Sequence, residues 1–189
     1  MKKIVIRFNA PVILTFALLS LLALLLGNWT NGATTYQYFS VYRASLSDPL
    51  TYVRFFGHVL GHADYEHYMS NMLLILLVGP GLEEKYGSGP MVWTIALTAL
   101  ITGTVHFLDF LNTVLLGASG VVFMMIVLSS FTAMRRGEIP VTLILVVIFY
   151  LGGEIMDGLF KQDSISQITH IVGGLCGLVF GFTIRRGRR

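Results

Sequence analysis

Four polar residues in apolar surroundings have the types and spacing that hydrolytic chemistry needs, and two of them form a pair. His67 and Asn71 are four residues apart, so on a helix they share one face. Both side chains can donate hydrogen bonds, and two stacked donors could bind the negative charge that develops on a carbonyl oxygen. The structural alternative is that the pair only joins neighbouring helices.

A serine and another histidine supply the remaining groups. Ser119 lies in Gly117-Ala118-Ser119-Gly120, where small neighbours leave its hydroxyl uncrowded. If a helix begins at Ser119, its first N–H groups and its positive dipole end lie there too, so the Ser119 N–H could join the oxyanion donors. His170 could take the serine proton, because unperturbed histidine titrates near pH 6.5. Gly173 and Gly177 would let its helix pack closely, plausibly on that of Ser119.

Other chemistries fit this sequence less well. The metalloprotease motif H-E-x-x-H is absent, and His62 and His67 are five apart, so they do not share a helical face as i, i+4 ligands do. A di-aspartyl site needs two close carboxylates in the membrane, and Glu154 and Asp157 lie near the end of one predicted helix. A Ser–His dyad needs the fewest assumptions, and no metal or cofactor is expected.

The elements that must position these residues are membrane-spanning helices. Of 189 residues, 54% are hydrophobic and 12% charged, and the mean hydropathy is +0.74. A soluble domain carries about 25% charged residues, so the composition excludes that class and predicts a polytopic membrane protein. A span needs roughly 17 to 25 mainly apolar residues. The six predicted spans are residues 11–27, 68–82, 91–107, 115–134, 140–156 and 168–184.

The basic residues predict the orientation of these spans. With the N-terminus inside, ten of the 13 Lys and Arg residues fall in inner segments. Both termini are then cytoplasmic, and the basic tail lies near anionic lipid, with no nucleic-acid partner expected. All five histidines fall at the outer side, together with Ser119. The first span could instead be a secretory signal peptide, but no clear cleavage motif follows, which favours a retained span.

Together these motifs resemble the rhomboid family of intramembrane serine proteases, from about residue 54 to residue 177. The family's H-x-x-x-N, G-x-S-G and histidine–G-x-x-x-G motifs match His67–Asn71, Gly117–Gly120 and His170 with Gly173 and Gly177. Arg54-Phe55-Phe56 with His58 and His62 resembles the end of the family's first loop. The order of the motifs on alternate helices, all at the outer face, makes the resemblance specific.

The resemblance implies an all-α, six-transmembrane-helix bundle in which residues 1–189 form a single domain. It implies a multi-pass membrane protein that cleaves single-span membrane proteins near the outer face. The compact size of the chain leads us to expect a bacterial plasma membrane protein. Ser119 would be the nucleophile and His170 the general base. His67, Asn71 and the Ser119 N–H would form the oxyanion hole. The supporting residues would be His62, Gly117, Gly120, Phe123, Gly173 and Gly177.

One position departs from the family pattern. Many bacterial members carry tyrosine four residues after the serine, where this chain has Phe123. A phenyl ring could still stack on His170, but it has no hydroxyl to tether the imidazole. The alternative function is a catalytically inactive rhomboid-like protein that binds membrane clients, which the presence of both Ser119 and His170 disfavours. The natural substrate and the oligomeric state do not follow from the sequence.

Overall fold

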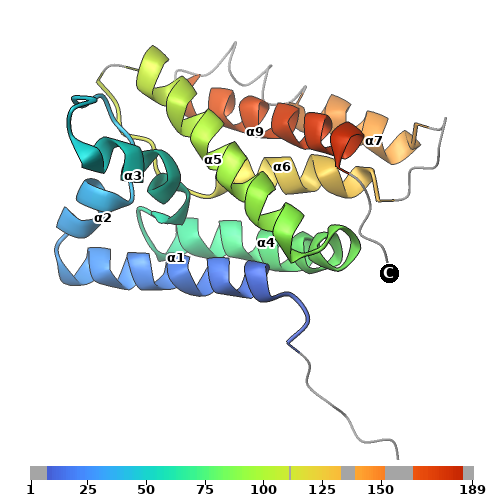
Figure 1. The fold of residues 1–189 in the computed structure, drawn as a ribbon, viewed down its shortest axis with the longest axis horizontal. Coiled ribbons are helices and arrows are strands. Elements are labelled where there is room, and N and C mark those ends of the chain that lie inside the picture. Colours follow the sequence, from blue (N-terminus) through green and yellow to red (C-terminus); the bar gives the residue numbers. More distant parts are fainter. Residues whose placement is uncertain (1–7, 111, 133–138, 152–163, 185–189) are drawn as a thin grey trace, which may run out of the picture.

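The computed structural model describes residues 8–110, 112–132, 139–151 and 164–184, and this part of the chain is all-α (Figure 1). Its helices are α1 (Pro11–Trp29), α2 (Ala33–Tyr38), α3 (Pro49–Gly57), α4 (Tyr65–Tyr86), α5 (Ser88–Asp109), α6 (Ser119–Ser130), α7 (Val141–Val146) and α9 (Ser164–Thr183). A 3-10 turn, η1 (His58–Leu60), precedes α4, and a π-helical turn, η2 (Val147–Leu151), follows α7. The predicted helical class is therefore confirmed for the described residues.

Two of these helices are long and apolar enough to cross a membrane by length and composition, α1 and α5. The six predicted spans each overlap a helix, but among the described residues the other four do not meet this criterion. Helix α4 has 22 residues, but charged residues lie in its first and last turns, including Glu66 and Lys85. Helix α6 has only 12 residues.

The fourth predicted span began too early. It was expected to start at Leu115, but Leu115 is extended and forms an antiparallel bridge with Val41, with both N–H to O distances 2.9 Å. Helix α6 starts only at Ser119. Hydropathy cannot separate an extended apolar residue from a helical one, which is why the prediction was wrong here. The predicted ends at residues 134 and 156 lie outside the described residues.

Helix α6 lies at the centre of the bundle. Helices α1, α4, α6 and α9 run roughly alongside one another in Figure 1, and α5 crosses them obliquely. Residues 120–128 of α6 are all buried, whereas α1 has one buried and one exposed face. A helix that is apolar and buried all round is typical of such a central position.

Helix α9 packs against α6 through two glycines, as the sequence predicts. A Cβ atom at Gly173 would overlap the carbonyl oxygen of Gly120, and one at Gly177 would lie 2.5 Å from the Met124 oxygen. The backbones of the two helices therefore touch, an approach that small residues allow. This contact sets the depth at which the first turns of α9 lie beside the start of α6.

The loop between α1 and α4 is tied down by a buried arginine. The Arg54 side chain is 5% exposed, and its Nε donates to the Gln37 carbonyl at 3.0 Å. Its guanidinium also pairs with Asp48 at 3.2 Å and lies over the Tyr42 ring, 4.6 Å from the centroid. A buried charge is tolerated when it is paired and hydrogen-bonded in this way, so Arg54 holds the loop at the end of the bundle that carries α2 and α3.

At the opposite end a buried carboxylate joins α4 to α1. The Glu83 oxygens accept hydrogen bonds from the N–H groups of Val12 and Ile13, both at 3.0 Å. The Ser88 hydroxyl donates to the same carboxylate at 2.7 Å. Since the first N–H groups of a helix have no partner within it, Glu83 caps α1 from a helix some 70 residues away in sequence.

Candidate active site

The chain reverses from an extended segment into α6 at Gly117. This residue has φ +123°, in the region that favours glycine, and its N–H donates to the His58 carbonyl at 2.9 Å. Ser119 is the first residue of α6, and Ala118 at the preceding position gives no side-chain cap. The condition under which the Ser119 N–H could join the oxyanion donors, a helix that begins at Ser119, is therefore met. The N–H groups of this first turn therefore have no acceptor within the helix, and they lie at the positive end of the helix dipole.

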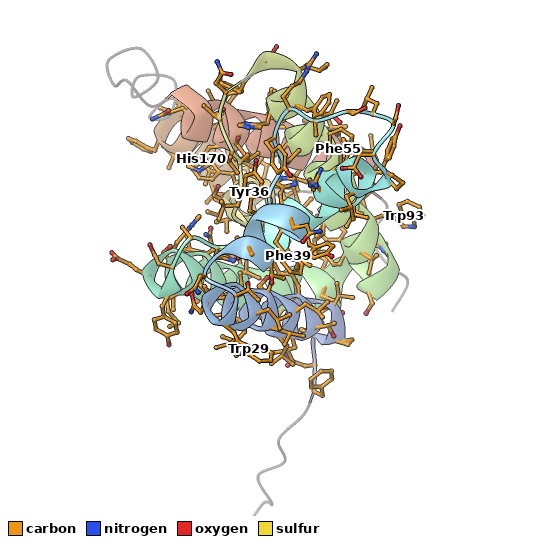
Figure 2. The ribbon with its side chains drawn as sticks, turned by 90° about the vertical axis from the view of Figure 1, so that its left-hand side faces the viewer. Trp29, Tyr36, Phe39, Phe55, Trp93 and His170 are labelled. Carbon is orange, nitrogen blue, oxygen red and sulfur yellow. The ribbon has the colours of Figure 1, made fainter. Side chains whose placement is uncertain are left out.

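His170 lies on α9 beside the first turns of α6. Its imidazole stacks on the Phe123 ring with centroids 4.3 Å apart and planes 8° from parallel. Phe123 is one helical turn beyond Ser119, so the two share a face of α6 and His170 lies over that face. The stacking that the sequence left open is therefore present, and packing orients the imidazole at this contact. Figure 2 looks onto the end of the bundle where His170 lies.

Gly120 keeps the space between the helices narrow. A Cβ atom there would lie 3.1 Å from the Thr102 methyl of α5 and 3.3 Å from the Thr169 methyl of α9. Three helices therefore converge immediately beside Ser119. A larger residue at position 120 would push α9, and His170 with it, away from α6.

His67 lies against the backbone that leads into Ser119. Asp64 caps α4 by accepting from the His67 N–H at 2.7 Å, which fixes the start of this helix. A Cβ atom at Gly117 would lie 2.8 Å from His67 Nε2, so the absent side chain of this glycine is what admits the imidazole.

Asn71 is buried one turn further along α4. Its Nδ2 donates to the His67 carbonyl at 2.9 Å, and its side chain is 6% exposed. An amide nitrogen carries two N–H groups, and this bond uses one of them. Asn71 therefore lies on the face of α4 that His67 occupies, as the i, i+4 spacing predicts.

His62 packs beside His67 from the loop before α4. Its ring lies 5.1 Å from the His67 ring and 5.5 Å from the Tyr68 ring, edge-on to both. Its Nδ1 lies 3.2 Å from the Leu60 carbonyl, which can only accept, so Nδ1 carries the proton. Burial, with His67 nearby, lowers the pKa of His62 to about 4, and the ring is neutral at pH 7. These contacts fit a positioning role.

Thr102 and the carbonyl of His58 also lie beside the start of α6. The sequence did not single out Thr102 as part of the site. Thr102 Oγ1 lies 3.3 Å from His58 Nε2, and the methyl group of Thr102 faces Gly120. Since the His58 carbonyl holds the Gly117 N–H, this pair links α5 to the start of α6. The available signal was Thr94, Thr98 and Thr102 at four-residue intervals, all buried.

His106 does not join this group. Its Nε2 lies 3.2 Å from the Thr113 carbonyl, and its ring stacks on Phe110 with centroids 5.3 Å apart. It therefore braces the connection between α5 and α6. The clustering of all five histidines at one side of the membrane, predicted from the sequence, combines residues with different structural tasks.

The described part of the chain defines a class: a helical bundle in which two apolar helices have membrane-spanning length and a group of histidine, asparagine and serine lies at one end. A model of the Rhomboid domain matches residues 49–187. The chain therefore belongs to the rhomboid family of integral membrane proteins.

Two curated relatives agree with this assignment. The chain is 31% identical over 145 residues to Rhomboid-related protein 1 of Caenorhabditis elegans, covering 69% of this chain and 39% of that protein. It is 26% identical over 174 residues to Rhomboid-related protein 2 of Mus musculus, covering 78% of this chain and 56% of that protein. The chain thus spans only about two fifths to just over half of the length of these relatives.

Proposed function

We propose that this chain is an intramembrane serine endopeptidase in which Ser119 is the nucleophile and His170 the general base. The stacking of His170 on Phe123 carries the proposal, because it brings the imidazole onto the face of α6 where Ser119 begins the helix. The Ser119 hydroxyl attacks the scissile carbonyl while His170 takes its proton. His170 then returns that proton to the leaving amine, and water hydrolyses the acyl-enzyme.

The oxyanion formed in this attack is bound by three donors. They are His67, the second N–H of the Asn71 amide and the backbone N–H of Ser119. The contact of His67 with Gly117, two residues before the nucleophile, supports this assignment. One donor of this kind is worth roughly 3–4 kcal/mol of transition-state stabilisation. His62, Gly117, Gly120, Phe123, Gly173 and Gly177 act as positioning residues.

The proposed substrates are membrane proteins with a single span, cut near the outer face. A continuous helix hides its carbonyls in internal hydrogen bonds, so the cleaved segment must be locally unwound. The proposal places residues 1–189 in one domain of six spans in a bacterial plasma membrane, with both termini in the cytoplasm. Membership of a family made up mostly of serine proteases supports the activity.

The test compares wild type, Ser119→Ala and Ser129→Ala in liposomes that contain a single-span model substrate. Ser129 is the matched control, because it lies on the same helix and its hydroxyl bonds to the Ile126 carbonyl. We expect cleavage by wild type and Ser129→Ala only, and fluorophosphonate labelling that disappears in Ser119→Ala. Cleavage that survives Ser119→Ala refutes the dyad. Folded protein with neither cleavage nor labelling indicates an inactive client-binding protein.

A further inference from the structure

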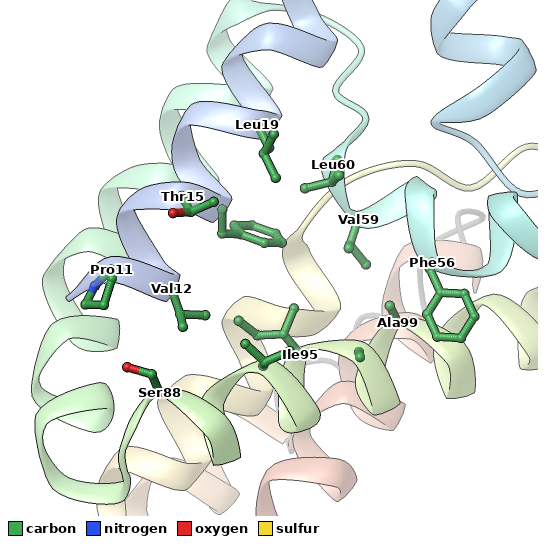
Figure 3. Close-up of a pocket in the computed structure, with 13 residues that line it drawn as sticks. Pro11, Val12, Thr15, Leu19, Phe56, Val59, Leu60, Ser88, Ile95 and Ala99 are labelled. Atoms are coloured by element: carbon green, nitrogen blue, oxygen red, sulfur yellow. The ribbon is translucent and has the colours of Figure 1, made fainter.

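A long apolar groove lies between α1, α5 and the loop that carries η1, away from the candidate active site. It encloses about 490 Å³, and Figure 3 shows side chains from all three elements pointing into it. Val12 and Leu19 come from α1, Ile95 and Ala99 from α5, Phe56 from the end of α3 and Leu60 from η1. Among the described residues of its lining, Thr15 and Ser88 carry the side-chain hydroxyls.

The groove opens onto surface that faces lipid. Its two long walls, α1 and α5, are the helices whose length and composition suit a membrane span. Large apolar side chains of these two helices are well exposed, with Leu18 at 63% and Leu22 at 52% on α1, and Trp93 at 68% on α5. Because this family is integral to membranes, such a surface contacts acyl chains and not water.

The dimensions of the groove suit one leaflet. From Ser88 to Ala99 the α5 wall rises by about 1.5 Å per residue, which amounts to about 16 Å. The hydrocarbon core of a bilayer is about 30 Å thick, so the groove runs through about half of it. Ser88, at one end, is the first residue of α5 and follows the last turn of α4, which carries Lys85, so this end fits the polar region of the bilayer.

We propose that one acyl chain of a membrane phospholipid occupies this groove as a retained structural lipid. The end of the acyl chain nearest η1 supports this turn, because Val59 and Leu60 form that part of the groove wall. The Leu60 carbonyl accepts from His62, and His62 packs on His67. The bound chain thereby stabilises the loop that positions the candidate active site, although its presence does not depend on the proposed catalytic activity.

The test uses the full chain in phosphatidylethanolamine–phosphatidylglycerol vesicles that contain a trace of phospholipid with a diazirine in its acyl chain. After irradiation, adducts are mapped by mass spectrometry. We expect at least fivefold more adducts on groove residues than on Leu73 and Leu77, which are 67% and 76% exposed on the lipid-facing side of α4. Equal labelling of both sets means ordinary boundary lipid and overturns the proposal.

Two variants fill the groove from opposite walls. Ala96→Phe acts from α5 and Thr15→Trp from α1, where Thr15 is exposed. The control is Leu97→Phe, at an exposed neighbouring position that does not line the groove. Each filling variant should reduce groove adducts at least fivefold, and Leu97→Phe should not.

Thermal unfolding in detergent gives a second readout. Added phospholipid should raise the unfolding temperature of wild type and of Leu97→Phe, and raise it much less in the filled variants. Groove labelling that persists in both filled variants overturns the proposal. So does the absence of groove adducts in wild type, because another occupant, such as a second copy of the chain, would then exclude the acyl chain.

Discussion

Removing the carboxylate of Glu83 should destabilise the bundle at the end opposite the candidate active site. Its two oxygens accept three hydrogen bonds, from the Val12 and Ile13 N–H groups and from the Ser88 hydroxyl. The residue is 4% exposed, so little water can replace these bonds in Glu83→Ala. A hydrogen bond to a charged group contributes about 1.5–3 kcal/mol. Removing the buried carboxylate also removes the free-energy cost of its desolvation, which offsets part of the loss of these hydrogen bonds.

We therefore expect Glu83→Ala to lower the free energy of unfolding by about 2–4 kcal/mol. Glu83→Gln should cost less, because its carbonyl oxygen still accepts from one or two of the donors. The matched control is Glu84→Ala, at an exposed neighbouring position, with an expected change within about 0.5 kcal/mol. The assay is unfolding in detergent micelles with increasing sodium dodecyl sulfate. Equal unfolding midpoints for Glu83→Ala and Glu84→Ala would refute the capping role.

Three further predictions follow from the site and its surroundings. Phe123→Ala removes the stack on His170, which is worth about 0.5–1.5 kcal/mol, so turnover of the model substrate should fall up to about tenfold. Phe123→Tyr should keep at least wild-type turnover. Unchanged turnover in Phe123→Ala would contradict this role of the stack. Gly173→Val forces α9 away from the Gly120 carbonyl and should cost more than about 3 kcal/mol of unfolding free energy, whereas Leu175→Val, on the exposed face, should cost under about 1. Burial lowers the pKa of both His58 and His62, in the loop between α1 and α4, to about 4. Between about pH 4 and pH 6.5 the unfolded chain binds more protons than the folded chain. The stabilising contribution of the two neutral rings is therefore fully present above about pH 6.5 and is lost as the pH falls towards 4. A flat unfolding midpoint between pH 7.5 and pH 4.5 would show that these rings are not buried neutral.

The sequence by itself determined the helical class and the candidate chemistry. Long apolar stretches bounded by charged or glycine-rich segments are local features, and helices form where they occur. The i, i+4 spacing of His67 and Asn71 and the glycines around Ser119 are equally local. Gly173 and Gly177 follow the same local logic, because their spacing marks a smooth helix face on which another helix can pack closely.

Tertiary structure decided whatever depends on a partner distant in sequence. Leu115 looks like part of an apolar helix until Val41 supplies the backbone partner that keeps it extended. Glu83 looks like a polar helix end until it meets the unpaired N–H groups of α1. In the sequence Thr102 is an ordinary helix residue, and only the fold places it between His58 and Gly120. Hydropathy scores each residue alone, whereas a buried polar group is stable only through the partner that satisfies it, and that partner is set by packing.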